Sequence, residues 1–326
     1  MERIGGSRIP VVGWAVIVLA GLGALAACIA EVGPGWLCGA GSIAIVTAYS
    51  WALAARTGGR PIVVGTLALV LGLAVVLIDD DSLRTGAAVL TCVVAAVLAV
   101  MSTVPAVRFV HAVREVLVAV AIAALGGLAV VGFEPVVTLA RFEYVTLGLA
   151  LLGAFAVVYR LGAGLHGLGR RGVLTVLIGS VVLALTLAYA ELLRRYGTPA
   201  LVTTMLEGVV WSRENLGAFP RPLETVLGVP ALAWGTHMRA RRRQGWWVCA
   251  FGVAATAPIA SSLLNPSVTY AEIVLSIGYG VVVGLVIGFV LIRLDLALTG
   301  SPGRGGRRAE EAGALRPEPA RTRPLL

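Results

Sequence analysis

The chain has 326 residues, of which 58% are hydrophobic and 13% are charged, and its formal net charge is +9. Soluble globular proteins carry about 25% charged residues. This composition, with a mean hydropathy of +0.93, therefore excludes an ordinary soluble domain and indicates a protein built for lipid. All 26 basic residues are arginine, a lysine-free usage that suggests a GC-rich bacterial genome. Because the arginines lie in short gaps beside apolar runs, where they orient helices, we expect no nucleic-acid partner.

Hydrophobic stretches recur along the whole chain, and each approaches the roughly 20 apolar residues that a helix needs to cross a bilayer. We therefore expect an all-α, polytopic bundle of about ten transmembrane helices, within a range of eight to ten. The eighth stretch is the weakest because it is short and contains Pro230, and it could re-enter the membrane instead of crossing it. The predicted spans are residues 10–30, 36–55, 61–78, 86–104, 116–133, 144–159, 172–190, 224–237, 248–264 and 270–292.

The arginines alternate between the gaps that separate these spans. Twenty fall in one set of gaps, which includes both termini, and six fall in the other. Because positively charged residues mark the cytoplasmic side, we expect a multi-pass protein of the cell (cytoplasmic) membrane with both termini inside. The six arginines expected outside are Arg84, Arg141, Arg194, Arg195, Arg213 and Arg221.

Two segments depart from the rhythm of spans and short gaps. Residues 191–223 form the long extracytoplasmic loop of a transmembrane domain that covers residues 1–297. Within it, residues 200–212 carry an apolar stripe at helical spacing and end near Trp211, which predicts a short helix on the outer surface. Residues 298–326 are rich in arginine and proline without apolar periodicity, so we expect a disordered cytoplasmic tail whose arginines rest on anionic lipid headgroups.

The outer loop is the candidate ligand-binding site. Arginine forks suit phosphate groups, whereas glutamate and asparagine suit sugar hydroxyls, so we expect an anionic or polyol ligand near the outer headgroups. The alternative is that arginines and glutamates of the loop pair with one another, because residues 191–224 hold four of each. The candidate residues are Arg213, Glu214, Asn215, Arg221 and Glu224, with Arg194 and Arg195 expected to converge on the same place.

The interior of the predicted spans lacks ionisable side chains. Away from their ends the spans contain no Asp, Glu, Arg or His, and ion-coupled transporters usually need such residues at mid-membrane. This pattern disfavours a proton-coupled pump but leaves room for a carrier of lipids or neutral solutes. The best polar group runs from Ser261 and Ser262 to Asn265 and Pro266; its simpler interpretation is a helix end followed by a turn.

The four cysteines show no spacing that is typical of a metal site, and we expect neither a metal nor a cofactor. Cys28 and Cys38 lie near the predicted outer surface on adjacent helices, where a disulfide could form; otherwise they are small apolar side chains. The string from Leu25 to Cys28 also fits a bacterial lipobox. Its position in a first span that is followed at once by another favours a transmembrane helix over a cleaved signal.

The stretch RPLETVLGVPALAWG, from Arg221 to Gly235, is followed by a basic loop, a GWW start and a final Gly-rich span. This arrangement resembles the C-terminal part of a family of uncharacterised bacterial polytopic membrane proteins, often encoded beside cell-surface polysaccharide pyruvylation genes. The resemblance covers the last third, from Glu214 to about Arg293, and rests on Arg-Pro-x-Glu followed by Pro-Ala-Leu. It implies a cell-envelope setting.

These observations favour a non-catalytic integral membrane protein that handles or transports a lipid-linked or anionic cell-envelope precursor. Its expected partners are the lipid bilayer and an anionic lipid or lipid-linked saccharide. The main alternative is a scaffold that recruits envelope assembly proteins through the outer loop and the tail. An integral-membrane transferase is the weaker alternative, because such enzymes need an acid or His at an accessible membrane surface and only Glu214 and Glu224 qualify.

Overall fold

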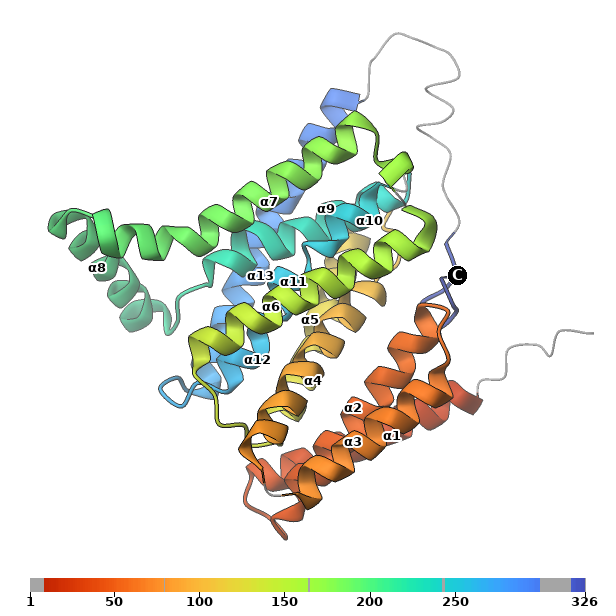
Figure 1. The fold of residues 1–326 in the computed structure, drawn as a ribbon. Helices are drawn as coiled ribbons and strands as arrows, with labels where there is room; N and C mark the ends of the chain where they lie inside the picture. Colours follow the sequence, from red (N-terminus) through yellow and green to blue (C-terminus); the bar gives the residue numbers. More distant parts are fainter. Residues whose placement is uncertain (1–8, 79, 164, 242–243, 300–317, 326) are drawn as a thin grey trace, which may run out of the picture.

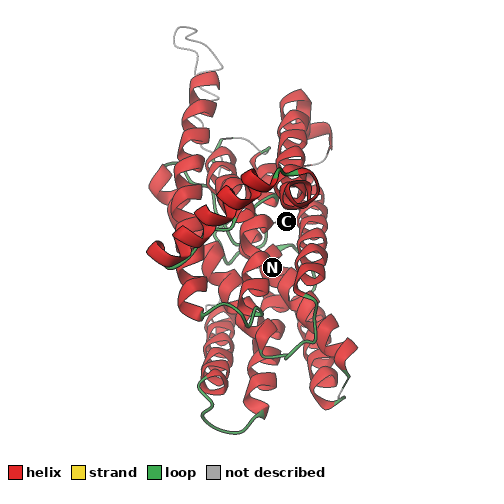
Figure 2. Ribbon diagram, turned by 90° about the vertical axis from the view of Figure 1, so that its left-hand side faces the viewer, coloured by secondary structure: helices red, strands yellow, loops and turns green. Residues whose placement is uncertain are grey.

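The computed structural model describes residues 9–78, 80–163, 165–241, 244–299 and 318–325. Throughout these residues the regular structure is helical, without a strand (Figure 1). A view turned by 90° again shows helices joined by loops (Figure 2). The prediction of an all-α polytopic fold is therefore confirmed.

The first three helices pack together as an N-terminal group (Figure 1). They are α1 (Ile9–Ile29), α2 (Trp36–Arg56) and α3 (Pro61–Leu77). Glycine lets α1 and α2 approach closely: a Cβ at Gly41 would lie 2.7 Å from the carbonyl oxygen of Gly21. Small residues at such crossings are typical of helix pairs in lipid, where association depends on close van der Waals packing.

The next three helices form the centre of the bundle. They are α4 (Asp81–Met101), α5 (Phe109–Val131) and α6 (Leu139–Val158), and both α5 and α6 contact α4. Asp80 caps α4 by accepting a hydrogen bond of 2.9 Å from the backbone amide of Leu83. Where α4 meets α5, a Cβ at Gly126 would lie only 2.2 Å from the Cβ of Ala95, so this contact requires glycine.

A long helix and a shorter one follow. After the π-helical turn η1 (Tyr159–Ala163), α7 runs over Leu165–Tyr196 and α8 over Pro199–Leu216. The helix predicted at residues 200–212 is therefore present, and it extends farther in both directions. It ends at Gly217, whose φ of +77° is the left-handed conformation that glycine adopts without strain. Helix α8 projects from the side of the bundle (Figure 1).

The C-terminal third contains several short helices before one long helix. The π-helical η2 (Leu223–Gly228) leads into α9 (Val229–Arg239), and α13 (Tyr270–Thr299) closes the bundle. Between them, α10 (Gly245–Ala250), α11 (Val253–Thr256) and α12 (Pro258–Leu263) form one broken path that is almost wholly buried. Pro258 begins α12, where its missing N–H interrupts no hydrogen bond of that helix.

Eight helical segments of the described chain are long and apolar enough to cross a membrane, and they correspond to eight of the ten predicted spans. This is a multi-pass integral membrane protein. The third predicted span appears as the shorter apolar helix Pro61–Leu77. The eighth, the weakest in sequence, is divided between η2 and α9.

The C-terminal segment, residues 318–325, lies against the bundle beside the end of α2 (Figure 1). We expected this stretch to belong to a disordered tail because it lacks apolar periodicity. Its position depends instead on polar contacts with residues far away in the sequence, described below, which no local pattern reports. Residues 300–317 of the predicted tail are outside the described residues.

Candidate functional site

Charged and polar side chains gather at two opposite ends of the bundle. Helical segments η2 and α9 run from just after Arg221 to Arg239, so these two arginines are on the order of 25 Å apart at a helical rise near 1.5 Å per residue. We call the surroundings of these residues the Arg221 site and the Arg239 site. The first contains part of the predicted outer cluster, and the second was not predicted.

The Arg221 site joins three elements that are distant in sequence. Nη1 of Arg221 donates to the carbonyl oxygen of Pro258 at 3.1 Å and to Oγ of Ser261 at 3.2 Å, both in α12. The same nitrogen lies 3.8 Å from Oε1 of Glu143 in α6. About a third of each of the Arg221 and Glu143 side chains remains exposed. This arginine therefore links the broken helix to α6 while part of its side chain remains exposed.

Glu224 lies beside this arginine but faces the interior. Its residue is 1% exposed, and Oε1 has no hydrogen-bond partner among the described residues. A Cβ at Gly280 would lie 3.0 Å from the carboxyl carbon of Glu224, so glycine in α13 makes room for this carboxyl group. A buried oxygen without a partner is costly, and such an atom is a candidate acceptor for a ligand hydroxyl.

The other predicted loop residues are held elsewhere. Nε of Arg213 pairs with Oε1 of Glu272 in α13 at 3.2 Å, and the side-chain amide of Asn215 donates to the carbonyl of Trp211 at 2.8 Å. Glu214 is exposed. Arg213 and Arg221 thus pair with glutamates outside the loop. The sequence suggests either a shared ligand site or ion pairs within the loop, and neither hypothesis includes these partners.

Arg194 and Arg195 lie on the last turns of α7, and their side chains are outside the described set. Ser261 and Ser262, singled out in the sequence as the best polar group near a helix end, are both buried in α12. Their hydroxyls donate to the carbonyl of Pro258 at 2.8 and 3.0 Å. Of the two interpretations offered for this group, the helix end with a turn describes its local structure, and Ser261 additionally contacts Arg221.

The Arg239 site surrounds a guanidinium that is completely buried. Arg239 ends α9 and donates to Oγ1 of Thr103 at 2.7 Å and to the carbonyl of Thr103 at 3.1 Å. Its guanidinium carbon lies 3.4 Å from the centroid of the Trp246 ring, a cation–π contact. The carboxylate of Glu318 completes the set, 2.6 Å from Nη2.

Two further buried charges belong to the same end of the bundle. Glu115 in α5 has no exposed side-chain surface and accepts from the amide of Val104, from Arg114 and from Arg321 at 2.8 to 3.0 Å. Arg56 at the end of α2 donates to the carbonyls of Met101 and Ala320 at 3.0 and 2.8 Å. Sequence reasoning missed this network because its residues lie at span ends or in the tail, where charges are usually solvated. The acid at Glu115 in an otherwise basic gap was the available signal.

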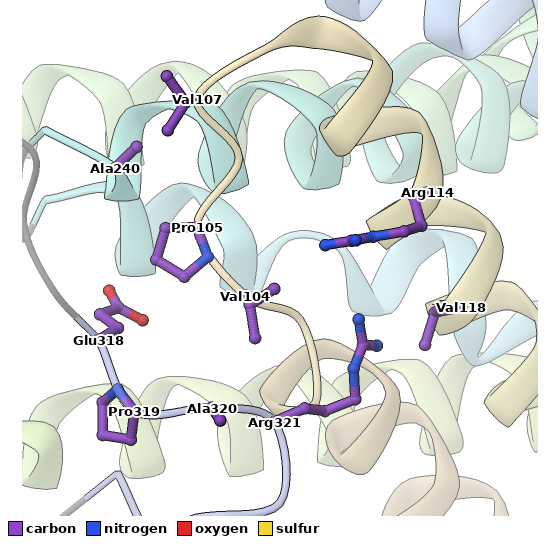
Figure 3. Close-up of a pocket in the computed structure, with 10 residues that line it drawn as sticks. All are labelled: Val104, Pro105, Val107, Arg114, Val118, Ala240, Glu318, Pro319, Ala320 and Arg321. Atoms are coloured by element: carbon purple, nitrogen blue, oxygen red, sulfur yellow. The ribbon is translucent and has the colours of Figure 1, made fainter.

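A cavity of about 800 Å³ adjoins this second site, not the predicted outer cluster. Its walls come from the α4–α5 connection, from the start of α5 and from the C-terminal segment (Figure 3). Arg114 and Arg321 project into the same region, and Glu318 lies on the opposite side (Figure 3). The described residues contain no group of three or more His, Cys, Asp or Glu that could hold a metal ion.

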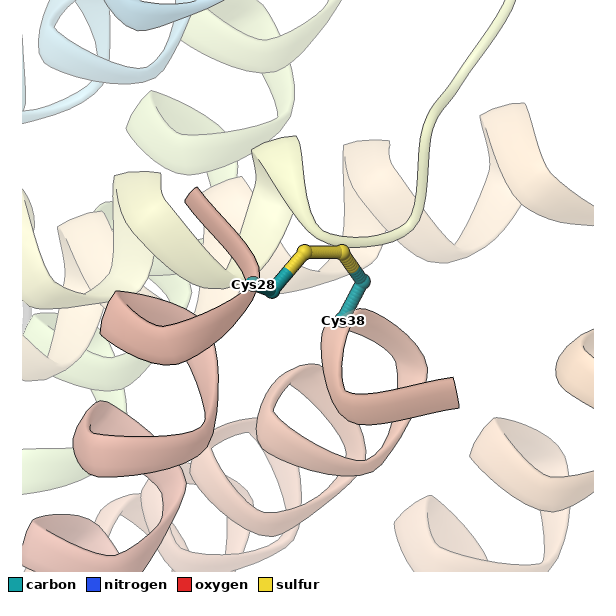
Figure 4. The surroundings of a disulfide bond; sticks show 2 residues. All are labelled: Cys28 and Cys38. Atoms are coloured by element: carbon teal, nitrogen blue, oxygen red, sulfur yellow. A yellow bond between two sulfur atoms is a disulfide. The ribbon is translucent and has the colours of Figure 1, made fainter. Parts of the chain in front are cut away.

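Cys28 and Cys38 form a disulfide that joins the end of α1 to the start of α2, with Cα atoms 5.4 Å apart (Figure 4). Of the two interpretations offered for this pair, a disulfide or small apolar side chains, the structure shows the disulfide. Lipidation of Cys28 would require its thiol to be free, so the two states exclude each other. Cys92 and Cys249 are buried and free.

Comparison with protein-family models, with curated proteins and with solved structures finds no match. The resemblance to the pyruvylation-associated membrane proteins therefore stays a prediction, and the function has to be argued from the geometry of the two sites.

Proposed function

We propose that this protein is a membrane carrier that handles a lipid-linked or anionic cell-envelope precursor, with Arg221 binding the anionic group. The observation that carries the proposal is how Arg221 is held. The hydrogen bonds and the ion pair that its side chain makes with described residues all use Nη1. Nε and Nη2 thus remain as a pair of donors with the geometry that suits a phosphate or carboxylate.

The broken helix next to Arg221 supports the same proposal. Carrier sites in membranes are typically formed where helices are interrupted, since irregular backbone is tolerated there only when it is buried in protein or lines a cavity. Here α10, α11 and α12 replace one continuous span, and Arg221 contacts α12 directly at Pro258 and Ser261. A ligand that binds Arg221 would therefore act directly on the broken helix α10–α12, the part of the bundle best able to rearrange.

Glu224 supplies the complementary group of the proposed site. Its unpartnered Oε1 is buried one helical turn after Arg221. Because carboxylates accept hydrogen bonds from hydroxyls, this oxygen suits a sugar or polyol attached to the anionic group. A substrate that combines both groups, such as a sugar phosphate linked to a lipid, matches this pair better than a simple inorganic anion.

Native mass spectrometry of the protein in mild detergent tests the proposal, with a polyprenyl phosphate and a neutral polyprenol as added probes. We expect the phosphate to bind the unaltered protein and to bind Arg221→Ala about tenfold more weakly, as for loss of one charge-assisted contact. Arg141→Ala is the matched control, because Arg141 is an exposed arginine close to Glu143 in sequence. Equal binding by both variants, or equal binding of the neutral alcohol, would refute the proposal.

A scaffold remains the second candidate, and one observation favours it. Helix α8 projects from the bundle (Figure 1) with Met205, Leu206, Val210 and Trp211 about half or more exposed. Such an apolar face suits a partner helix as well as a lipid surface. If the protein is a scaffold, Leu206→Ser with Val210→Ser should abolish its cellular role while Arg221→Ala leaves it intact. If the protein is a carrier, Arg221→Ala should abolish its cellular role and Leu206→Ser with Val210→Ser should leave it intact.

A further inference from the structure

The Arg239 site has the properties of a preformed receptor for a carboxylate. Arg239 has no exposed surface, and two of its nitrogens donate to Thr103. The flat face of its guanidinium rests on Trp246. These contacts come from the helical bundle and not from the C-terminal segment. They fix the orientation of the Arg239 guanidinium before any anion binds.

Backbone packing also fixes this receptor. A Cβ at Gly245 would lie 2.5 Å from the backbone nitrogen of Arg239 and 2.8 Å from its Cγ. Only glycine permits the first residue of α10 to approach so closely, and this approach brings Trp246 onto the guanidinium. The close packing of the α9–α10 connection therefore fixes the geometry of the receptor.

Glu318 occupies the receptor through both carboxylate oxygens. Nη2 of Arg239 lies 2.6 Å from Oε2, and Nε lies 3.4 Å from Oε1. A buried cation without an anion is strongly unfavourable, so the receptor requires an anionic occupant. In this structure that occupant is a residue of the chain's own C-terminal segment.

Polar contacts attach the rest of the segment to the bundle. Arg321 binds Glu115, the amide of Leu325 donates to the carbonyl of Arg56 at 2.8 Å, and Arg56 donates to the carbonyls of Ala320 and Arg323. Leu325 is the residue of this segment that packs against the apolar core. Residues 320 and 322–324 are exposed. Because the segment buries little apolar surface, its attachment depends on these polar contacts and on the Arg239–Glu318 pair, so a second anion that replaces Glu318 at Arg239 would favour release of the segment.

We propose that Arg239, Thr103 and Trp246 form a carboxylate-binding site whose ligand is the C-terminal segment 318–325, held there as an exchangeable wall of the adjoining cavity. The segment forms one wall of the cavity when Glu318 is bound, and it opens that side when another anion replaces Glu318. This inference is independent of the proposed carrier function, because it concerns the opposite end of the bundle and none of the residues of the Arg221 site.

A nitroxide spin label on Thr322→Cys in the full chain tests the proposal, because Thr322 is exposed. In the parent protein we expect a mostly immobilised label. In Glu318→Gln the ratio of mobile to immobilised label should rise about tenfold, as for loss of one charge-assisted hydrogen bond. Glu207→Gln, which removes an exposed glutamate on α8, is the matched control and should leave the spectrum unchanged.

Exchange is tested by adding an acetylated synthetic peptide with the sequence of residues 318–325 to the labelled parent protein. The peptide should raise the mobile fraction, and the same peptide with Gln in place of Glu318 should not. Thermal unfolding of each variant shows whether the bundle is intact. Equal spectra for Glu318 and Glu318→Gln would overturn the role of Glu318, and failure of the acidic peptide to compete would overturn exchange.

Discussion

Arg239 and Glu318 are 79 residues apart in sequence, yet Nη2 of the arginine lies 2.6 Å from Oε2 of the glutamate. The arginine is fully buried, and the glutamate side chain is 11% exposed. Because ion pairs in a low-dielectric setting hold only when each remaining donor is satisfied, the contacts of Arg239 with Thr103 and Trp246 matter as much as the pair itself. The C-terminal segment is therefore part of the folded bundle at this end.

Glu115 should contribute to stability through its buried carboxylate. It accepts hydrogen bonds from the amide of Val104 and from Arg114 and Arg321. We expect Glu115→Ala to lower the free energy of unfolding by about 1–3 kcal/mol, because these donors lose their acceptor. Glu115→Gln should cost less, since it keeps one acceptor oxygen. Thermal unfolding in detergent measures both, with Glu207→Gln as the exposed control; equal midpoints for all would contradict the prediction.

Glycine at position 228 should be essential for the packing of η2 on α11. A Cβ there would lie 2.1 Å from the backbone nitrogen of Ala255, and backbone cannot move aside cheaply. We expect Gly228→Ala to destabilise the protein by about 1–3 kcal/mol, the usual cost of overpacking. Gly278→Ala is the control, because nothing lies within 4 Å of its Cβ position and alanine favours helix. Similar unfolding curves for the two variants would contradict this packing.

The Cys28–Cys38 disulfide should be detectable by alkylation and should stabilise the N-terminal helices. Mass spectrometry after alkylation of the unfolded protein without reductant should show two modified thiols, at Cys92 and Cys249. Reductant should raise the number to four. For a loop of this length, loss of the bond in Cys28→Ser should cost about 2–3 kcal/mol. Four modified thiols without reductant would show that the bond does not form.

The arginine distribution predicts which residues face the cell exterior. In intact cells, a membrane-impermeant maleimide should label Glu214→Cys but not Arg108→Cys, and cell lysis should allow labelling of both. Both positions are exposed in the structure, so differences in burial do not explain the expected contrast. The opposite pattern would reverse the orientation derived from the positive-inside rule.

The membrane-spanning helices could be predicted from sequence because each is a local property. A run of apolar residues makes a span wherever it lies in the fold, which is why the eight candidate spans agree with the predicted ones. The weak prediction at 224–237 coincides with one continuous helical segment, η2 followed directly by α9, whose π-helical start and Pro230 no apolar pattern reports. The breaks within the ninth predicted span were not predicted, because residues 245–263 are hydrophobic enough on average to indicate one continuous span.

The spatial arrangement of the predicted outer residues could not be derived from the sequence. Sequence proximity placed Arg213, Asn215 and Arg221 together, whereas the structure pairs Arg213 with Glu272 and Arg221 with Glu143. These partners lie on other helices, and a single sequence contains no record of which helices are neighbours. The same reason explains why the Arg239 site was missed.

The sequence by itself determined that this chain is an all-α membrane protein, and it located most of its spans, because apolar length and charge are local quantities that the bilayer selects. Only the tertiary structure decided which charges meet. Glu115, Arg239 and Glu318 come from three distant parts of the chain, and burial turns three ordinary span-end or tail residues into one network. Burial and pairing depend on helix packing, which is set by glycine contacts such as that of Gly245 with Arg239 and not by any local pattern.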